Sequence, residues 1–279
     1  MFCVAAAWGG AGKEPARPGI DLTAVRVDGL ARVRIVHSDW PRHVWECRVP
    51  EQMRILGRGS EVLYPQEYFD ARIGTVTLSG LVERPRPARY RFVFRTSDEG
   101  VEIAATVWNT GDVAWDSSTS GLTCVVFSEA PNFFDEGGAL TSIHVGGEFV
   151  TVAELVQRSG LAGEAADEMM HATNVLRPED AGWNSAKPKR EIADLGLVVR
   201  SSEDGAHHVA VAWEDAFSVS YNLHDPRLNC IHSNPRFGAL EPGEFVTVHG
   251  RIYFFSGTID ELYERFERDC HAKGTTPAK

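Results

Sequence analysis

The sequence predicts an all-β protein, a large two-sheet antiparallel β-sandwich with a short C-terminal helix. Short runs that alternate apolar and polar residues recur from about residue 22 to the C-terminal end, which is typical of half-buried strands. Turn residues separate these runs at short intervals, whereas alternating β/α folds place a helical pattern between successive strands. The chain has 279 residues and is long enough to bury such a core without disulfides.

The predicted strands follow one another along the whole chain. The first half contains the runs RVRIVHSDW, HVWECRV, GTVTLSGLVE, ARYRFVFRT and VEIAATVWN. The second half contains LTCVVFSEA, SIHVGGEFV, LGLVVRS, HHVAVAWED, FSVSYNL and FVTVHGRIYFF. Residues 96–100, TSDEG, predict a tight hairpin because a glycine stands at the end of this short loop.

Two segments do not alternate and are predicted as long loops. Residues 50–72 are rich in Arg, Glu and Tyr. Residues 157–194 contain EAADEMMHATN, which predicts a short helix inside the second loop. Long loops inside a compact domain are often functional, so both segments are of interest for a site.

Two other helices are each predicted by their first turn. A threonine followed by a glutamate three residues later opens residues 151–155 and residues 258–270, and this pattern is a capping box. In the second segment the apolar residues fall on one helix face: Ile259, Leu262, Tyr263 and Phe266. We therefore expect the C-terminal helix to pack on the sandwich.

One domain over residues 21–279, after a flexible segment of residues 1–20, is the simplest organisation. The run from Phe2 to Trp8 is apolar but short, and no basic residue precedes it, unlike a usual secretory signal. A clipped signal stays an alternative, so a cytoplasmic protein and a secreted or periplasmic protein both agree with the sequence. No segment approaches about 18 unbroken apolar residues, so no membrane span is expected.

Composition and motifs argue against several functions. The formal net charge of −11 argues against a surface that neutralises nucleic-acid phosphates, and no RNA-binding signature is present. The five cysteines are widely spaced and include no CxxC pair. A disulfide framework and a zinc knuckle are therefore not expected, and the thiols are interpreted as buried apolar groups. No glycine-rich phosphate loop or GxSxG motif occurs, and no cofactor is expected.

Two stretches resemble the galactose mutarotase-like superfamily, whose members include the aldose 1-epimerases. In residues 101–127 a strand leads into the turn Asn-Thr-Gly-Asp at residues 109–112 and then into a second strand. In residues 230–255 the segment LEPGE, residues 240–244, matches the family's Leu-x-Pro-Gly-Glu turn into a closing strand. The two stretches cover about a fifth of the chain. The resemblance implies a carbohydrate ligand in a cleft on a concave face of the sandwich.

The two catalytic positions that the resemblance implies are not retained. In the epimerases the strand after the Asn turn supplies a histidine acid, but residues 121–124 of this chain read GLTC. The late strand of the family supplies a glutamate base, and His232 stands at that place here. Aldose epimerisation needs one group that removes the anomeric hydroxyl proton and another that protonates the ring oxygen. Simple mutarotase activity is therefore not expected.

Residues 224–235, HDPRLNCIHSNP, carry most of the candidate site. On a strand over residues 228–231 and beyond, Cys230 and His232 share one face. Such a histidine is either a core residue bonded to backbone or an acid/base at the mouth of a cleft, and a metal ligand is a third interpretation. Arg227 is suited to clamp a carboxylate through two parallel hydrogen bonds.

The candidate catalytic residues are His232, Arg227 and His144, the last of which precedes a Gly-Gly turn and is a candidate for the same cleft. An ordinary hairpin is the alternative for His144. No spacing such as HExxH supports a metal site, so no metal ligands are assigned. The candidate substrate-binding residues are polar or aromatic: Asn234, Asn229, His224, Trp183 and Arg236. Trp183 is included because an indole face stacks well on a sugar ring.

A histidine base beside an arginine clamp suits proton abstraction next to a uronate carboxyl, as in a polysaccharide lyase or a uronate epimerase. The leading interpretation is therefore a carbohydrate-active protein that binds a sugar or a uronic-acid-containing glycan. Two alternatives stay open, a non-catalytic carbohydrate-binding module and a structural subunit of a protein complex. The sequence does not indicate an oligomeric state.

Overall fold

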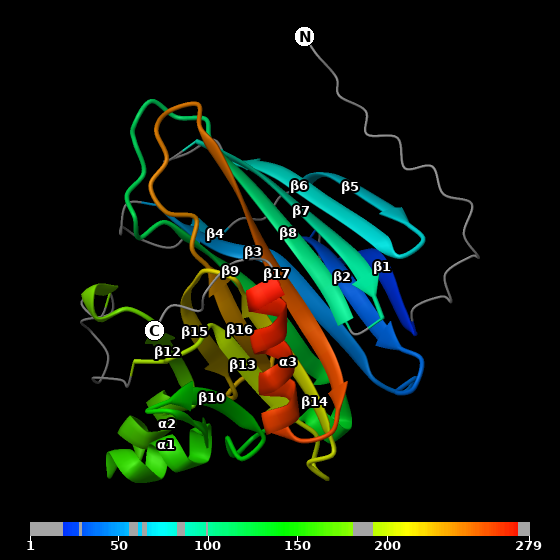
Figure 1. Cartoon of the computed structure of the whole chain (residues 1–279), viewed down its shortest axis with the longest axis vertical. Helices are drawn as coiled ribbons and strands as arrows, with labels where there is room; N and C mark the ends of the chain where they lie inside the picture. The colour runs from blue at the N-terminus through cyan, green and yellow to red at the C-terminus, as the bar shows by residue number, and fades with distance from the viewer. Residues whose placement is uncertain are drawn as a thin grey trace.

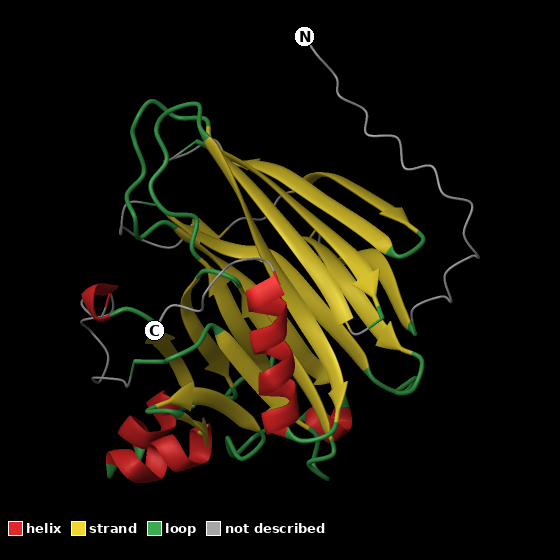
Figure 2. Cartoon of the chain, in the orientation of Figure 1, coloured by secondary structure: helices red, strands yellow, loops and turns green. Residues whose placement is uncertain are grey.

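The computed structural model describes residues 19–27, 30–55, 61–62, 66–82, 87–98, 100–180 and 192–272. In these residues antiparallel strands form two sheets that pack face to face, as Figures 1 and 2 show. The all-β two-sheet sandwich predicted from the sequence is confirmed.

In the described residues the first sheet has eight strands and the second has nine. The first sheet runs in the order β1 (Ile20–Val27), β2 (Leu30–His37), β3 (Val44–Arg54), β9 (Ser120–Glu129), β16 (Cys230–Pro235), β15 (Ala216–Asn222) and β12 (His171–Val175), with β4 (Glu61–Val62) paired to β3. The second sheet runs in the order β11 (Glu148–Thr151), β10 (Thr141–Val145), β13 (Leu197–Ser201), β14 (His207–Trp213), β17 (Phe245–Ser256), β8 (Gly100–Asn109), β7 (Ala88–Ser97), β6 (Thr75–Val82) and β5 (Gln66–Arg72).

The core lies between the sheets and is built from alternate residues of their strands. Val33 and Ile35 on β2 and Phe92 and Phe94 on β7 are at most 1% exposed. The residues between them point to the opposite face, because successive side chains of a strand alternate. The period-two pattern in the sequence therefore predicted which side chains enter the core.

Helix α3 (Ile259–Ala272) covers the outer face of the second sheet (Figure 2). Its buried Leu262 and Phe266 pack on Leu197 and Val199 of β13. The predicted capping box is present, since the Glu261 backbone N–H donates to the Thr258 hydroxyl over 3.2 Å and Glu261 accepts in return. Other helical segments of the described residues include α1 (Val152–Ser159), α2 (Glu164–Met169) and the 3-10 turn η1 (Pro131–Phe133).

Two predictions for the long loops are wrong in part. Residues 50–72 were predicted as a loop, yet β3 continues to Arg54 and β5 covers Gln66–Arg72. β5 is the last strand of its sheet, where charged residues are tolerated, and a register shift interrupts β3, so neither segment alternates cleanly. The short helix predicted within EAADEMMHATN is α2, but the end of this segment is strand β12, because residues 171–175 pair with β15.

Residues 1–18, which include most of the predicted flexible segment, and Trp183 lie outside the described residues. Within the described part, no helix combines the length and the apolar character that crossing a bilayer requires. The four cysteines that are described, at positions 47, 124, 230 and 270, are buried free thiols, as expected from the sequence.

The β7–β8 hairpin gives a first testable prediction. Gly100 has φ of +153°, and a Cβ atom there would lie 2.1 Å from the Ile252 carbonyl oxygen on β17. We expect Gly100→Ala to lower the free energy of unfolding by about 2–3 kcal/mol, because neither the backbone angle nor a backbone oxygen can relax easily. Urea unfolding checks this value. Gly137→Ala, with nothing within 4 Å of its added Cβ, is the control, and equal stabilities of the two variants would contradict the prediction.

Candidate functional site

A polar patch occupies the outer face of the first sheet, on the side away from the second sheet. Val125 on β9 and Ile231 on β16 belong to the core between the sheets. Strand alternation then turns Cys124, Cys230 and His232 to the outer face, as predicted for the last two. His232 is nevertheless only 5% exposed, so a polar side chain is buried on this outer face.

Four neighbouring strands contribute to one row across this face. His232 on β16 pairs with Ser220 on β15 and with Cys124 on β9, and Cys124 pairs with Arg48 on β3. The residues come from parts of the chain far apart in sequence. Their side chains are neighbours only because the strands are in register.

Asn234 lies beside this row and is 4% exposed. Its amide nitrogen donates to the hydroxyls of Ser218, over 2.9 Å, and Ser220, over 3.4 Å. Its carbonyl oxygen Oδ1 is buried and has no hydrogen-bond partner among the described residues. A buried acceptor without a partner is unfavourable, so a ligand hydroxyl at this position would satisfy it.

Glu51 is the acidic neighbour of His232, and sequence reasoning missed it. Its Oε2 lies 3.7 Å from His232 Nε2, and its side chain is 17% exposed. The register between β3 and β9 shifts between Arg48 and Gln52, so a bulge interrupts the pairing at this point. Bulges re-aim side chains, so alternation alone could not place Glu51 on this face. Pro50 was the available signal, since proline inside a strand often marks a bulge.

His232 also contacts a pair of cysteines. Cys230 Sγ lies 3.4 Å from His232 Nε2, and Cys124 lies in the same cluster. A hydrogen bond from Cys124 and the nearby imidazole hold the pKa of Cys230 well below its ordinary value, against the effect of burial. Burial and the same hydrogen bond raise the pKa of Cys124.

The charge state of His232 follows from its neighbours. Burial alone lowers the pKa of its imidazole, because desolvation penalises the charged form. The negative charges of Cys230 and Glu51, with the Ser220 backbone, outweigh burial and raise the pKa of His232 above its ordinary value. The imidazole of His232 therefore lies between the Cys230 sulfur and the Glu51 carboxyl group, and both neighbours favour its charged form.

An arginine group borders the same row on β2 and β3. Arg32 Nη1 lies 2.7 Å from Glu46 Oε2, and Arg48 Nη2 lies 3.4 Å from the same oxygen. The Nε atoms of Arg32 and Arg48 are buried without hydrogen-bond partners among the described residues. Two guanidinium groups share one carboxylate, so this corner carries excess positive charge beside the polar patch.

Asn229 serves the structure just before β16. It has φ of +39°, so the strand predicted from Leu228 begins two residues later, at Cys230. Asn229 Oδ1 accepts from Arg200 over 2.6 Å and from the Asp135 backbone N–H over 3.1 Å, and its amide donates to the Asp135 carbonyl over 2.7 Å. The side-chain oxygen and one amide hydrogen are therefore bonded to protein groups, and substrate binding by Asn229 stays a prediction.

Arg227 and His224 lie in the loop before β16. Arg227 forms two hydrogen bonds to the carboxylate of Asp225, and its side chain is 86% exposed. The Nε2 atom of His224 contacts the Asp167 carbonyl of α2. Neither residue has a described contact with His232, and their predicted roles stay predictions.

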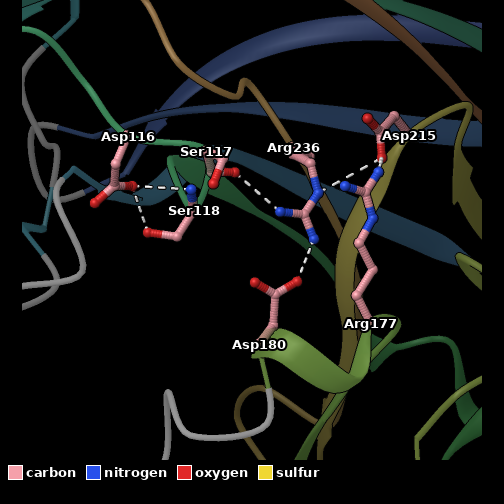
Figure 3. A network of polar contacts seen from close by, with 7 residues as sticks. All are labelled: Asp116, Ser117, Ser118, Arg177, Asp180, Asp215 and Arg236. Carbon is pink, nitrogen blue, oxygen red and sulfur yellow. Dashed lines mark hydrogen bonds and ion pairs between the residues drawn. The ribbon is translucent and has the colours of Figure 1, made fainter.

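Arg236 stands at the centre of the network in Figure 3. Its guanidinium donates to the Ser117 carbonyl over 2.9 Å and to Asp180 over 2.5 Å, and its Nε lies 3.6 Å from Asp215. The Arg236 and Asp180 side chains are 5% and 10% exposed, and Arg177 also pairs with Asp215. These contacts tie residues 177–180 to the sandwich, and substrate binding by Arg236 stays a prediction.

His144 and His232 lie on different sheets. His144 stacks on Tyr263 of α3 at 5.5 Å between ring centroids, and its Nδ1 lies 2.9 Å from Asp194 Oδ2. Helix α3 covers the outer face of the second sheet, whereas His232 lies on the outer face of the first sheet. The two histidines therefore do not share a cleft, and the Gly-Gly segment after His144 is the ordinary hairpin β10–β11.

A separate cavity of about 360 Å³ lies beside Trp40, which the sequence reasoning did not select. Its lining includes Trp40, Arg42, His43, Asp204 and His207. Trp40 stacks on His37, with ring centroids 4.7 Å apart. The volume falls within the range of small-ligand sites, roughly 300–1,000 Å³.

Comparisons with known proteins concern the fold. No protein-family model matches the chain, and none of the curated proteins matches it. Among solved structures, a galactose mutarotase-like protein from Lactobacillus casei ATCC 334 is 10% identical, with a TM-score of 0.44 over 84% of this chain and 100% of that chain. A galactose mutarotase related enzyme from Lactobacillus acidophilus is 11% identical, with a TM-score of 0.43 over 85% and 98%.

A third similar structure is the alpha-N-acetylgalactosaminidase from Bifidobacterium bifidum, in a complex with GalNAc. It is 9% identical, with a TM-score of 0.47 over 91% of this chain and 38% of that chain. Identities this low say nothing of activity.

Proposed function

We propose that the chain binds a sugar or a uronic-acid-containing glycan on the polar patch around His232 and transfers protons to and from it. The observation that carries this proposal is the pair of His232 and Glu51, whose Nε2 and Oε2 atoms lie 3.7 Å apart beside the unsatisfied carbonyl oxygen of Asn234. An imidazole and a carboxylate supply the acid and the base that epimerisation or elimination needs. The hydroxyls of Ser218 and Ser220 extend the polar surface.

Elimination from a uronate shows how the pair would act. A base removes the proton on the carbon next to the carboxylate, the bond to the neighbouring glycosidic oxygen breaks, and a carbon–carbon double bond forms. An acid then gives a proton to the departing oxygen. Glu51 and His232 match these two roles, and the low exposure of His232 keeps water from competing for the protons.

Arg48 is our candidate for holding the uronate carboxylate. It shares the register row with His232 across two strand spacings, about 10 Å, and its buried Nε lacks a partner among the described residues. Arg227, the anchor expected from the sequence, is 86% exposed and already bonded to Asp225. We expect Arg48→Met to weaken uronate binding by about 10–100-fold and to change neutral-sugar binding little, because the lost bond is charge-assisted.

Calorimetric titration of Arg48→Met and of Arg227→Met, the matched control, measures the loss of uronate affinity. If Arg227→Met lost more uronate affinity than Arg48→Met, Arg227 and not Arg48 would be the residue that binds the carboxylate.

A screen of uronic-acid polysaccharides, free uronates and neutral sugars tests the function. Absorbance detects the new double bond of an elimination, and NMR detects epimerisation. We expect a product from at least one sugar and its loss in His232→Gln. If no sugar gave a product and no sugar bound, the proposal would be refuted.

Binding without a product would favour the second candidate function, a non-catalytic carbohydrate-binding protein. The cavity beside Trp40 is the observation that favours it, since it combines an indole with charged and imidazole groups. In that case Trp40→Ala should weaken sugar binding at least tenfold, measured by titration, whereas Asn234→Ala should leave it unchanged. The opposite pattern would assign the sugar to the patch around His232.

A further inference from the structure

We propose that Cys124, Cys230 and His232 bind one thiophilic metal ion, for which Zn²⁺ is the expected ion. Their ligand atoms, two sulfurs and one imidazole nitrogen, all lie within 4.8 Å of one another. The three residues are buried. This inference goes beyond sugar binding, and its test uses no sugar.

The strand geometry builds this ligand set. Cys230 and His232 are two residues apart on β16, so both side chains leave the same face of the sheet. Cys124 stands opposite His232 on the adjacent strand β9. All three backbones are held by sheet hydrogen bonds between inner strands, so the ligands are positioned without help from a loop.

The distances suit a tetrahedral ion. With bonds of about 2.3 Å to sulfur and about 2.0 Å to nitrogen, a tetrahedral centre places sulfur and nitrogen ligands about 3.5 Å apart and two sulfurs about 3.8 Å apart. Cys230 Sγ and His232 Nε2 are 3.4 Å apart, and no pair of ligand atoms exceeds 4.8 Å. Closing the site therefore requires the separations between ligand atoms to shorten by at most about 1.3 Å, which side-chain rotation can supply.

Charge and ligand type favour the same ion. Thiolate and imidazole together select zinc or another soft ion over magnesium or calcium. Two thiolates balance the charge of Zn²⁺, so the loaded centre is neutral, which suits a buried place. The cluster contains Cys124 and Cys230, which lie 106 residues apart (230 − 124) and so show no spacing motif.

Glu51 is the candidate neighbour of the fourth coordination position. Its Oε2 lies 3.7 Å from His232 Nε2, and at 17% side-chain exposure it is more accessible than His232 at 6%. Three protein ligands with one open position are typical of zinc sites that keep a water molecule. Glu51 is therefore placed to accept a hydrogen bond from such a water or to become the fourth ligand.

Titration of the reduced full-length chain with Co²⁺ and Zn²⁺ tests the site. We expect one equivalent of Co²⁺ to give a sulfur-to-cobalt charge-transfer band with visible bands of tetrahedral intensity, and Zn²⁺ to abolish both. X-ray absorption of the zinc form should show two sulfur ligands together with nitrogen or oxygen. This measurement needs no variant, and a zinc shell without sulfur would overturn the proposal.

Variants then identify the ligands. We expect Cys124→Ser and Cys230→Ser each to weaken zinc affinity by more than the roughly 10–100-fold that the loss of an outer-shell partner causes. Cys47→Ser is the matched control, because Cys47 is equally buried on β3 but belongs to the core between the sheets. Equal zinc affinity of the three variants would overturn the assignment.

Metal binding should also affect catalysis, and this one expectation rests on the proposed function. A metal on Nε2 of His232 occupies the atom that would transfer the proton. Zinc should therefore inhibit turnover of the wild-type chain, and a chelator should restore it. Zinc binding without inhibition would refute this consequence while the metal site stands, whereas a spectrum without thiolate bands would refute the site itself.

Discussion

Replacing Arg200 by methionine is expected to lower the free energy of unfolding by about 3–5 kcal/mol. Arg200 is 0% exposed and donates to Asn229 Oδ1 over 2.6 Å, to the Phe133 carbonyl over 2.7 Å and to the Thr141 hydroxyl over 2.8 Å. Burial lowers its pKa to about 10, so the guanidinium is still charged at neutral pH. Methionine fills similar volume but leaves these acceptors and the buried Asp135 carboxylate without their cation.

Urea unfolding at neutral pH measures this loss, with the slope of the transition checked for two-state behaviour. Arg227→Met is the control, since its side chain is 86% exposed and its ion pair with Asp225 is local, and it should change stability by less than about 0.5 kcal/mol. Because Asn229 directly precedes Cys230, Arg200→Met should also weaken zinc binding, although Arg200 is not a ligand. A stability loss below 1 kcal/mol would show that the network is not needed for folding.

Replacing Glu51 by glutamine is expected to reduce kcat on the converted sugar by about 10²–10⁴-fold. Glutamine keeps the shape of the side chain but cannot take up a proton. The Michaelis constant should change little, because the base acts in the transition state more than in binding. Steady-state kinetics, with circular dichroism to confirm the fold, separates these two effects.

Glu129→Gln is the matched control for this loss of a carboxylate. Glu129 lies on β9 of the same sheet, pairs with Arg34 at 2.8 Å and has a 55% exposed side chain. It should leave kcat unchanged. Full turnover in Glu51→Gln would remove Glu51 from the proton-transfer pair, and a raised Michaelis constant with unchanged kcat would make it a binding residue.

Local sequence patterns predicted much of this fold. Alternation located most strands and turned Cys230 and His232 to one face, because the side-chain period of a strand is two wherever it pairs. The capping boxes located the starts of α1 and α3, since the bonds of a cap join residues three apart. The edge strands β5 and β12 were missed, because pairing with a neighbour, rather than their own pattern, makes them strands.

The candidate site depends on relations that no local pattern contains. The sequence by itself determined that His232 shares its face with Cys230 and stands where the resembled family carries a glutamate. Only the tertiary structure brought Cys124 beside them through strand register, turned Glu51 toward them at a bulge, and put His144 on the other sheet. The physical reason is that alternation sets the face of each residue within its strand. Sheet order and register, which depend on the packing of the whole core, decide which faces meet.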